Sequence, residues 1–156
     1  MPAPGRKKSS ATRQTAVDLG PLDDSVGYLL RRAQLAVFQG FFERFATFDI
    51  RPAQYTALAA IERNPGLSQT RLAHALGVKK TNLVALVDSL EARGLARRTS
   101  SEEDRRSHAL HLTRKGKLLV GRLHRADAAL DRRLSQSMTR EERRRFCEVL
   151  RRIASG

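Results

Sequence analysis

The sequence predicts a mainly α-helical fold with one small β-hairpin, and three observations support this prediction. Apolar residues recur at three- and four-residue steps along most of the chain after residue 24. In the middle of the chain, Gly77 separates two short helical patterns. Two short segments with alternating side chains then flank a polar stretch at 100–106. We therefore expect one helical domain over residues 21–156 that carries a short hairpin.

The first twenty residues differ in composition from the rest of the chain. Residues 1–20 are rich in Pro, Ser, Lys and Arg and lack apolar periodicity, so we expect a disordered basic tail. The pattern changes at residue 25. Apolar side chains then recur as far as Phe48, which predicts a long helix at 25–48 with a broad apolar face.

The centre of the chain carries residues that typically begin and end helices. Pro52 suits the first turn of a second helix, which the turn at 64–66 ends. Ser68 is suited to cap a short helix, Gly77 to turn the chain, and Gly94 to follow the next helix. Two short helices joined by a glycine turn are typical of a helix-turn-helix.

A charged hairpin is expected directly after these helices. Segments 95–99 and 109–113 have the pattern of strands, with Leu110 and Leu112 on one face of the second. A hairpin in this position is the wing of a winged helix-turn-helix. The sequence therefore predicts a winged helix-turn-helix at 52–113.

Two further helices are predicted at 114–154. Thr113 is suited to cap the first, and Thr139 with Glu142 forms the capping-box pattern for the second. Their apolar stripes, like that of 25–48, lack an evident partner within the chain. We therefore expect the N- and C-terminal helices to be dimerisation helices that pair with a second copy.

The charge balance indicates a polyanionic partner. The chain has 30 Lys and Arg against 16 Asp and Glu, a formal net charge of +14 and a pI near 11.3. A basic protein of this kind most often binds nucleic acid. We expect no membrane segment, because no apolar run approaches the roughly 18–20 residues that a membrane helix needs. The single cysteine fits the reducing cytoplasm.

These residues resemble the MarR family of bacterial transcription regulators. The motifs that carry the resemblance are Leu72-Ala73, Leu76-Gly77-Val78, the run from Leu86 to Leu95, Asp104-Arg105-Arg106, and Leu112-Thr113-Arg114-Lys115-Gly116. The resemblance extends from Ser25 to Ile153. It implies an obligate homodimer that binds a pseudo-palindromic operator as double-stranded DNA and is released by a small ligand. A repressor is the usual function in the family.

The chain departs from the family at three positions that bear on base preference. Lys79 and Ala85 stand where the family often has a serine and a basic residue, and Glu103 stands where it often has an arginine. The family's base preference is therefore not transferred to this chain. The segment 25–34 resembles a subgroup that controls the breakdown of hydroxycinnamates and responds to their coenzyme A thioesters.

The predicted DNA contacts lie on the helix-turn-helix and the wing. The first residues of a recognition helix reach base edges in the major groove, while helix N-termini and wing arginines suit the backbone or the minor groove. The predicted contacts are Ser68, Gln69, Lys79, Lys80, Thr81, Asn82, Arg97, Arg98, Arg105 and Arg106. A dimer would place two recognition helices roughly 34 Å apart on an inverted repeat.

An effector surface is predicted on the first long helix. Five of the six phenylalanines lie between Phe38 and Phe48, where they either fill the core or form a surface for a flat aromatic ligand. The predicted effector residues are Arg31, Arg32, Phe38, Phe41, Phe42, Phe45 and Tyr55. The arginines would receive an acidic group, and an aromatic acyl-CoA thioester is the effector that the subgroup resemblance implies.

Other functions fit the sequence less well. The main alternative is a structural nucleic-acid-binding protein without sequence preference, which would fit the high pI but have no effector. An enzyme is not expected, because the sequence shows no Gly-rich phosphate loop, nucleophile elbow or paired carboxylates. The four histidines do not converge on a metal site, and no cofactor is predicted. Cys147 is interpreted as a packing residue rather than a redox sensor.

Overall fold

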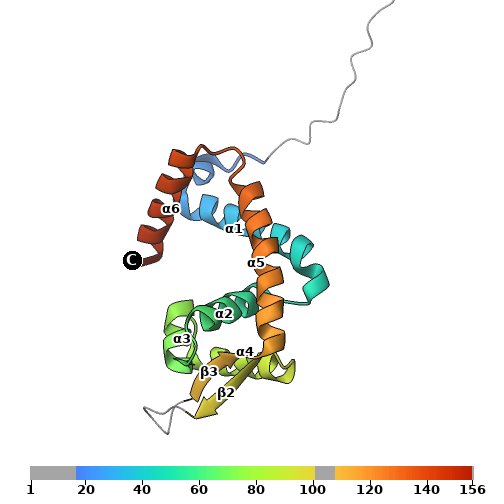
Figure 1. Cartoon of the computed structure of the whole chain (residues 1–156). Coiled ribbons are helices and arrows are strands. Elements are labelled where there is room, and N and C mark those ends of the chain that lie inside the picture. Colours follow the sequence, from blue (N-terminus) through green and yellow to red (C-terminus); the bar gives the residue numbers. More distant parts are fainter. Residues whose placement is uncertain (1–16, 101–107, 156) are drawn as a thin grey trace, which may run out of the picture. The chain divides into compact units, whose positions relative to one another are not determined.

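The computed structural model describes residues 17–100 and 108–155 (Figure 1). Its elements in chain order are η1 Gly20–Asp24, α1 Val26–Phe45, η2 Ala46–Phe48, α2 Pro52–Arg63, β1 Leu67–Ser68, α3 Gln69–Leu76, α4 Lys80–Ala92, β2 Ala96–Ser100, β3 His108–Leu112, α5 Arg114–Leu134 and α6 Arg140–Ser155. This order confirms the predicted fold class, a mainly helical protein with a small β wing.

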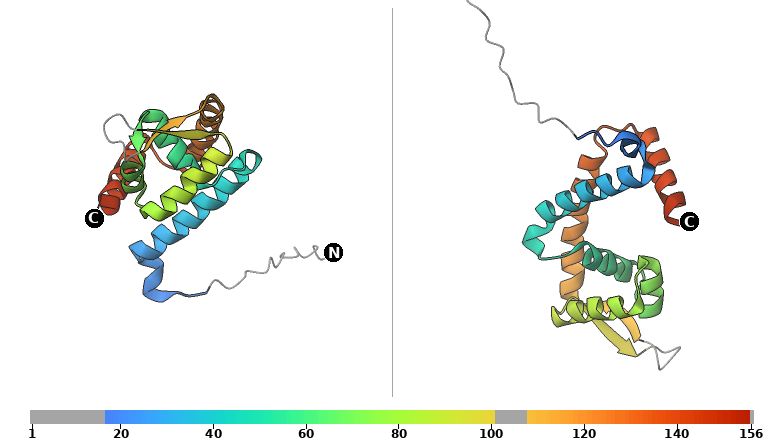
Figure 2. Two further views of the ribbon diagram at one scale, coloured as in Figure 1. Left: turned by 90° about the horizontal axis from the view of Figure 1, so that it is seen from below. Right: turned by 180° about the vertical axis from the view of Figure 1, so that it is seen from behind.

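The sheet has three antiparallel strands in the order β1-β3-β2. Ala96 pairs with Leu112 in the hairpin, and Leu67 pairs with Leu110 on the other edge. The sequence predicted the hairpin but not β1, because a strand of two residues is too short to show alternation. Both views in Figure 2 show the hairpin beside α4 and α3 next to α4.

Several residues predicted to begin or end helices make the expected capping interactions. The Ser68 hydroxyl accepts a hydrogen bond from the Arg71 N–H, and the Thr113 hydroxyl accepts one from the Gly116 N–H at 3.0 Å. Gly77 follows α3 with a φ of 63°, in the left-handed region that glycine adopts most easily. The remaining predicted boundary residues, Pro52, Gly94, Thr139 and Glu142, also occupy the expected positions.

The first long helix is shorter than its apolar pattern. The helix predicted at 25–48 is α-helical from Val26 to Phe45 and then tightens into η2. Asp49 follows with a φ of 49°, a left-handed conformation that ends the helix before the chain turns into α2. An apolar repeat shows which face is buried but does not distinguish an α-helix from a terminal 3₁₀ turn.

The chain divides into two compact units, residues 1–34 and 35–156. In the first unit, the described residues 17–34 form η1 and the beginning of α1. Four of these, 17–20, belong to the predicted tail, and Gly20 already begins η1. Residues 1–16 of that predicted tail lie outside the described part.

The core of the second unit is built from the winged helix-turn-helix and α5. Five of its elements each supply a fully buried leucine: Leu58 from α2, Leu72 from α3, Leu83 from α4, Leu110 from β3 and Leu123 from α5. Burying a side chain of this kind contributes about 2 kcal/mol. The helix α4, which is the predicted recognition helix, is held against α2, α3 and β2.

The apolar residues of the last helix remain exposed. No residue of α6 is buried, and Phe146, Val149 and Ile153 are each partly open to solvent. Among the described helices, none is long and apolar enough to cross a membrane.

Candidate nucleic-acid interface

The N-terminus of α4 presents an exposed, basic surface. Lys79 is the N-cap residue, and its side chain makes no capping hydrogen bond. Lys80, Thr81 and Asn82 follow, all exposed, and the first turn carries no acidic residue. The free N–H groups and positive end of the helix dipole therefore add to two lysine charges. This arrangement suits a polyanion.

The start of α4 is held in place by its neighbours on the buried face. Leu83 is completely buried one turn from Lys80, and Val78 donates its N–H to the carbonyl of Ala73 in α3. Gly77 makes the turn between α3 and α4. The polar end of α4 is therefore presented on a fixed backbone, as recognition of base edges requires.

Two predicted contacts at the start of α3 also have partners within the chain. The Ser68 hydroxyl caps α3, and the Gln69 side-chain oxygen accepts a hydrogen bond from Arg98 at 3.2 Å. Both side chains are half-buried. Ser68 and Gln69 therefore have structural functions in the free chain. Their contact with a DNA phosphate stays a prediction.

Arg98 forms the centre of a polar cluster that joins the wing to the recognition helix. Its guanidinium pairs with Asp88 at 2.7 Å and with Glu91. Its backbone N–H also donates to Glu91 at 2.6 Å, and further hydrogen bonds reach Gln69 and the Val84 carbonyl. The Arg98 side chain is only 19% exposed. Arg98 therefore positions β2 against α3 and α4, and its contact with a DNA phosphate stays a prediction.

The neighbouring arginine is available to a ligand. Arg97 pairs with His111 across the hairpin and is exposed. Because successive strand residues point to opposite faces, Arg98 points toward the polar cluster and Arg97 points toward solvent. The predicted contacts Arg105 and Arg106 lie outside the described residues.

The predicted effector residues on α1 divide into two groups. Phe41 and Phe45 are buried in the core, and their rings stack at 3.8 Å between centroids. The core interpretation therefore describes these two in the free chain, and their contact with an effector stays a prediction. Phe38 and Phe42 are exposed, Phe42 by 55%, and a ligand can reach both rings.

The predicted arginine partners of the effector lie in the first unit. Arg31 and Arg32 are both exposed. Arg32 donates to the Tyr28 hydroxyl at 3.2 Å, and its guanidinium lies 5.9 Å from the centroid of that ring.

A polar chain between α2 and α5 was not predicted from the sequence. The Tyr55 hydroxyl lies 3.0 Å from Nδ1 of His124, and Nε2 of His124 lies 2.7 Å from the Glu62 carboxylate. Burial and the nearby carboxylates of Asp127 and Glu62 raise the pKa of the Tyr55 phenol. Tyr55 and His124 are 69 residues apart, so no local spacing indicates this contact.

Comparison with known proteins identifies the family. The model of the MarR family matches residues 48–107. A proposed transcriptional regulatory protein for the hcr operon of Thauera aromatica is 35% identical over 135 residues, which are 86% of this chain and 81% of that protein. The chain belongs to the MarR family.

Solved structures of MarR-family regulators share the fold of this chain. The transcriptional repressor CouR bound to a 23-mer DNA duplex is 40% identical, with a TM-score of 0.84 over 88% of this chain and 98% of that chain. CouR bound to p-coumaroyl-CoA is 37% identical, with a TM-score of 0.81 over 88% and 97%. The PcaV regulator from Streptomyces coelicolor with its natural ligand is 25% identical, with a TM-score of 0.79 over 90% and 99%. This chain is a MarR-type transcriptional regulator.

The raised pKa of Tyr55 makes the stability of this MarR-family protein depend on pH in alkaline solution. The folded state holds the phenol proton more tightly than the unfolded chain does, so this contribution is present below the ordinary tyrosine pKa of about 10 and is lost above it. Tyr55→Phe should therefore show a smaller loss of stability between about pH 8 and about pH 11 than the unchanged protein. Urea unfolding midpoints at both pH values measure the difference, and equal losses would contradict it.

Proposed function

We propose that this protein is a ligand-responsive transcriptional repressor that binds a pseudo-palindromic operator as a homodimer. An aromatic acyl-CoA thioester, such as a hydroxycinnamoyl-CoA, releases it from DNA. The observation that carries this proposal is the exposed, uncapped and basic N-terminus of α4 on a buried scaffold. CouR, which shares the fold, has been solved both on a DNA duplex and with p-coumaroyl-CoA.

DNA recognition is assigned to the start of α4 and to the wing. Asn82 is suited to pair with adenine and Lys80 to meet guanine in the major groove. Lys79 and Thr81 flank them, and Arg97 with the wing tip would contact the backbone or the minor groove.

Homodimerisation is supported by the apolar side chains that the terminal helices leave open. The exposed apolar residues of these helices are Val26, Leu29, Leu35, Phe38 and Phe42 of α1 and Phe146, Val149 and Ile153 of α6. Exposed apolar residues concentrated on two helices are typical of an interaction surface rather than of a monomer. A second copy also supplies the two-fold symmetry that an inverted-repeat operator requires.

The effector is proposed to contact the exposed aromatic residues of α1. Phe38 and Phe42 present their rings at 6.5 Å between centroids, next to the buried Phe41. Rings arranged in this way suit a flat aromatic group. Tyr55 would complete this group of side chains, and Arg31 and Arg32 would receive an acidic group.

Selection of duplexes from a random pool, followed by binding measurements, tests the DNA part of the proposal. We expect an inverted repeat to be selected, and affinity to fall by about 0.9 log unit per phosphate contact for each log unit of salt. Asn82→Ala should change which base is preferred, whereas Arg97→Ala should weaken all duplexes alike. Arg63→Gln removes an exposed charge at the end of α2 and is the control. Recovery of no common sequence would favour the alternative, a structural nucleic-acid-binding protein.

Calorimetry with p-coumaroyl-CoA and with free p-coumarate tests the effector part. We expect the thioester to bind and to release the selected duplex, as measured by fluorescence anisotropy. Phe42→Ala should weaken thioester binding by about tenfold, because it removes an exposed ring that a ligand can reach. A thioester that neither binds nor releases DNA would remove this effector class from the proposal.

A further inference from the structure

Two adjoining hollows lie beside α5 and the end of α1, away from the predicted base contacts at the start of α4. Their volumes are about 640 and 470 Å³, and both are lined by Thr47, Phe48 and Arg122. We call them together the cationic cleft, because six basic side chains line them: Arg44, Arg93, Arg114, Lys115, Arg122 and Arg125. No acidic residue of the described ranges 17–100 and 108–155 lines either hollow.

Two of the six basic side chains have structural tasks. Arg93 donates to the backbone carbonyls of Phe48 and Asp49, and so fixes the turn before α2 to the end of α4. Lys115 donates to the Arg93 carbonyl at 2.8 Å, at the C-terminus of α4. These two residues therefore have a structural function that does not require a ligand.

The other four make no ion pair with any residue in the described part of the chain. They are Arg44, Arg114, Arg122 and Arg125. The Nε of Arg44 is also buried without a hydrogen-bond partner there. A buried donor without a partner and like charges gathered in one cleft are both unfavourable, and a bound anion relieves both.

The first turn of α5 adds to the positive potential. Arg114, Lys115 and Lys117 occupy this turn, and it contains no acidic residue. Acidic residues are normally favoured there, because the N-terminus of a helix is the positive end of its dipole. Basic residues in this position are therefore unfavourable for the isolated helix but favourable for a site that binds phosphate groups.

The cleft also has an apolar part that a simple inorganic anion would leave uncovered. The Arg122 guanidinium lies 5.0 Å from the centroid of the Phe48 ring. Leu118, which is 67% exposed, and Leu119 continue this surface along α5. A planar guanidinium next to an aromatic ring suits a heterocyclic base, which stacks on such planes. The volume of each hollow is in the range of small-molecule sites.

The position of the cleft separates it from DNA. Arg93 follows the last residue of α4, whereas the predicted base contacts begin at Lys80. Thirteen helical residues separate these ends by about 20 Å. A duplex read by the start of α4 would therefore lie at the other end of the helix from the cleft.

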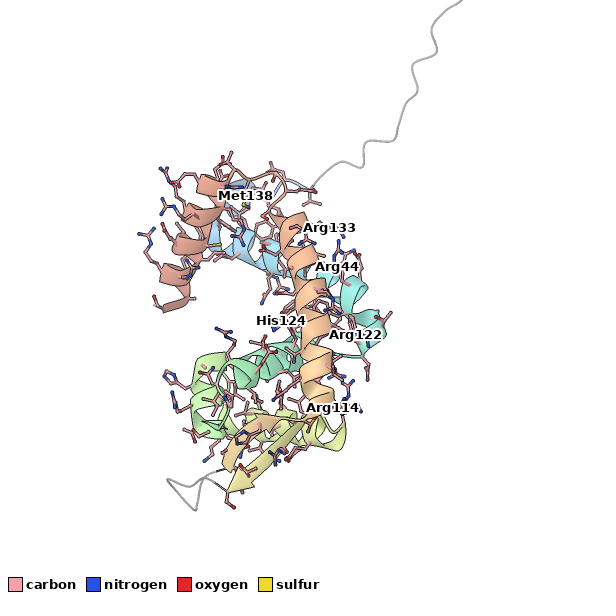
Figure 3. The ribbon with its side chains drawn as sticks, in the orientation of Figure 1. Arg44, Arg114, Arg122, His124, Arg133 and Met138 are labelled. Carbon is pink, nitrogen blue, oxygen red and sulfur yellow. The ribbon has the colours of Figure 1, made fainter. Side chains whose placement is uncertain are left out.

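The cleft lies on the opposite face of α5 from the polar chain of Tyr55 and His124. Arg122 and His124 are two positions apart on α5, a rotation of about 200°, so they lie on opposite faces of the helix. Figure 3 shows Arg44, Arg122 and Arg133 on one side of α5 and His124 on the other. His124 belongs to the polar chain with Tyr55, on the effector side.

We propose that the cationic cleft binds a nucleoside polyphosphate. The base lies against Phe48 and Arg122, and the phosphates are held by Arg44, Arg114 and Arg125. This chemistry has two sources, a free nucleotide such as ADP or the nucleotide end of a coenzyme A thioester. The coenzyme A source rests on the proposed function, whereas the free nucleotide source does not.

Calorimetric titration of the full chain with ADP, coenzyme A and inorganic pyrophosphate tests this proposal. We expect ADP or coenzyme A to bind, and Arg122→Gln and Arg125→Gln each to weaken that binding by about tenfold. Arg63→Gln removes one exposed charge outside the cleft and should leave the affinity unchanged. Binding of ADP identifies a free nucleotide as sufficient, and binding of coenzyme A alone identifies the thioester as the source.

Three results would overturn the proposal. These are no binding of either ADP or coenzyme A, an equal loss in Arg63→Gln, and pyrophosphate binding as tightly as the nucleotides. The proposed function fails separately, when p-coumaroyl-CoA does not release DNA. ADP binding that depends on Arg122 and Arg125 would stand even then.

Discussion

Replacing Gly116 by alanine is expected to remove about 3 kcal/mol or more of the free energy of unfolding. A Cβ atom at this position would lie 2.0 Å from the carbonyl oxygen of Leu95, which is far inside contact distance. That oxygen accepts hydrogen bonds from the backbone N–H of Thr113 at 3.1 Å and from its hydroxyl at 3.3 Å. The obstacle is therefore backbone held between the hairpin and α5, and it cannot move aside without breaking the cap of α5.

Gly121 offers a matched control on the same helix. A Cβ atom there would meet nothing within 4 Å, so Gly121→Ala should stabilise the protein by up to about 1 kcal/mol through helix propensity alone. Gly40→Ala should give an intermediate result, because its Cβ would meet the flexible end of the Leu130 side chain at 2.8 Å. Urea unfolding followed by circular dichroism measures all three. Similar midpoints for Gly116→Ala and Gly121→Ala would contradict the prediction.

The helix boundaries could be predicted from the sequence because capping is a local interaction. Ser68 and Thr113 each bind a backbone N–H three residues further on, and Thr139 and Glu142 bind each other across the same spacing. These side chains act within one helical turn, so the residue types and their spacing contain most of the information. The winged helix-turn-helix follows from the order of these boundaries.

The partners within the candidate site could not be predicted in this way. Arg98 reaches Glu91 and Asp88 only because β2 returns along α4, and Gln69 is 29 residues away. The burial of the Phe side chains could not be predicted either. Phe41 and Phe42 are neighbours in the sequence, but tertiary packing buries only Phe41. A strand as short as β1 is defined by its partner β3 rather than by its own residues.

Replacing Arg98 by methionine is expected to weaken operator binding by more than about tenfold, because Arg98 positions the wing against the recognition helix. The substitution leaves the carboxylates of Asp88 and Glu91 on α4 without their cation and removes the hydrogen bond to Gln69 at the start of α3. Breaking a half-buried charged cluster by removing one partner costs about 1–3 kcal/mol. The wing and the recognition helix would then lose their fixed relation, so both stability and affinity should fall.

Two further variants distinguish a positioning residue from a residue that contacts phosphate. They are Arg98→Lys and Arg97→Ala. Arg98→Lys keeps the charge but cannot reach Asp88, Glu91 and Gln69 together, so it should restore little of the stability or the affinity. Arg97→Ala should lower the salt dependence by about 0.9 log unit per lost phosphate contact and leave the unfolding midpoint unchanged, because Arg97 is exposed on the other face of β2. Full rescue by lysine, with a salt dependence lowered only in Arg98→Met, would show that Arg98 contacts the DNA backbone directly. The cluster with Asp88 and Glu91 would then be an arrangement of the free protein that DNA binding replaces.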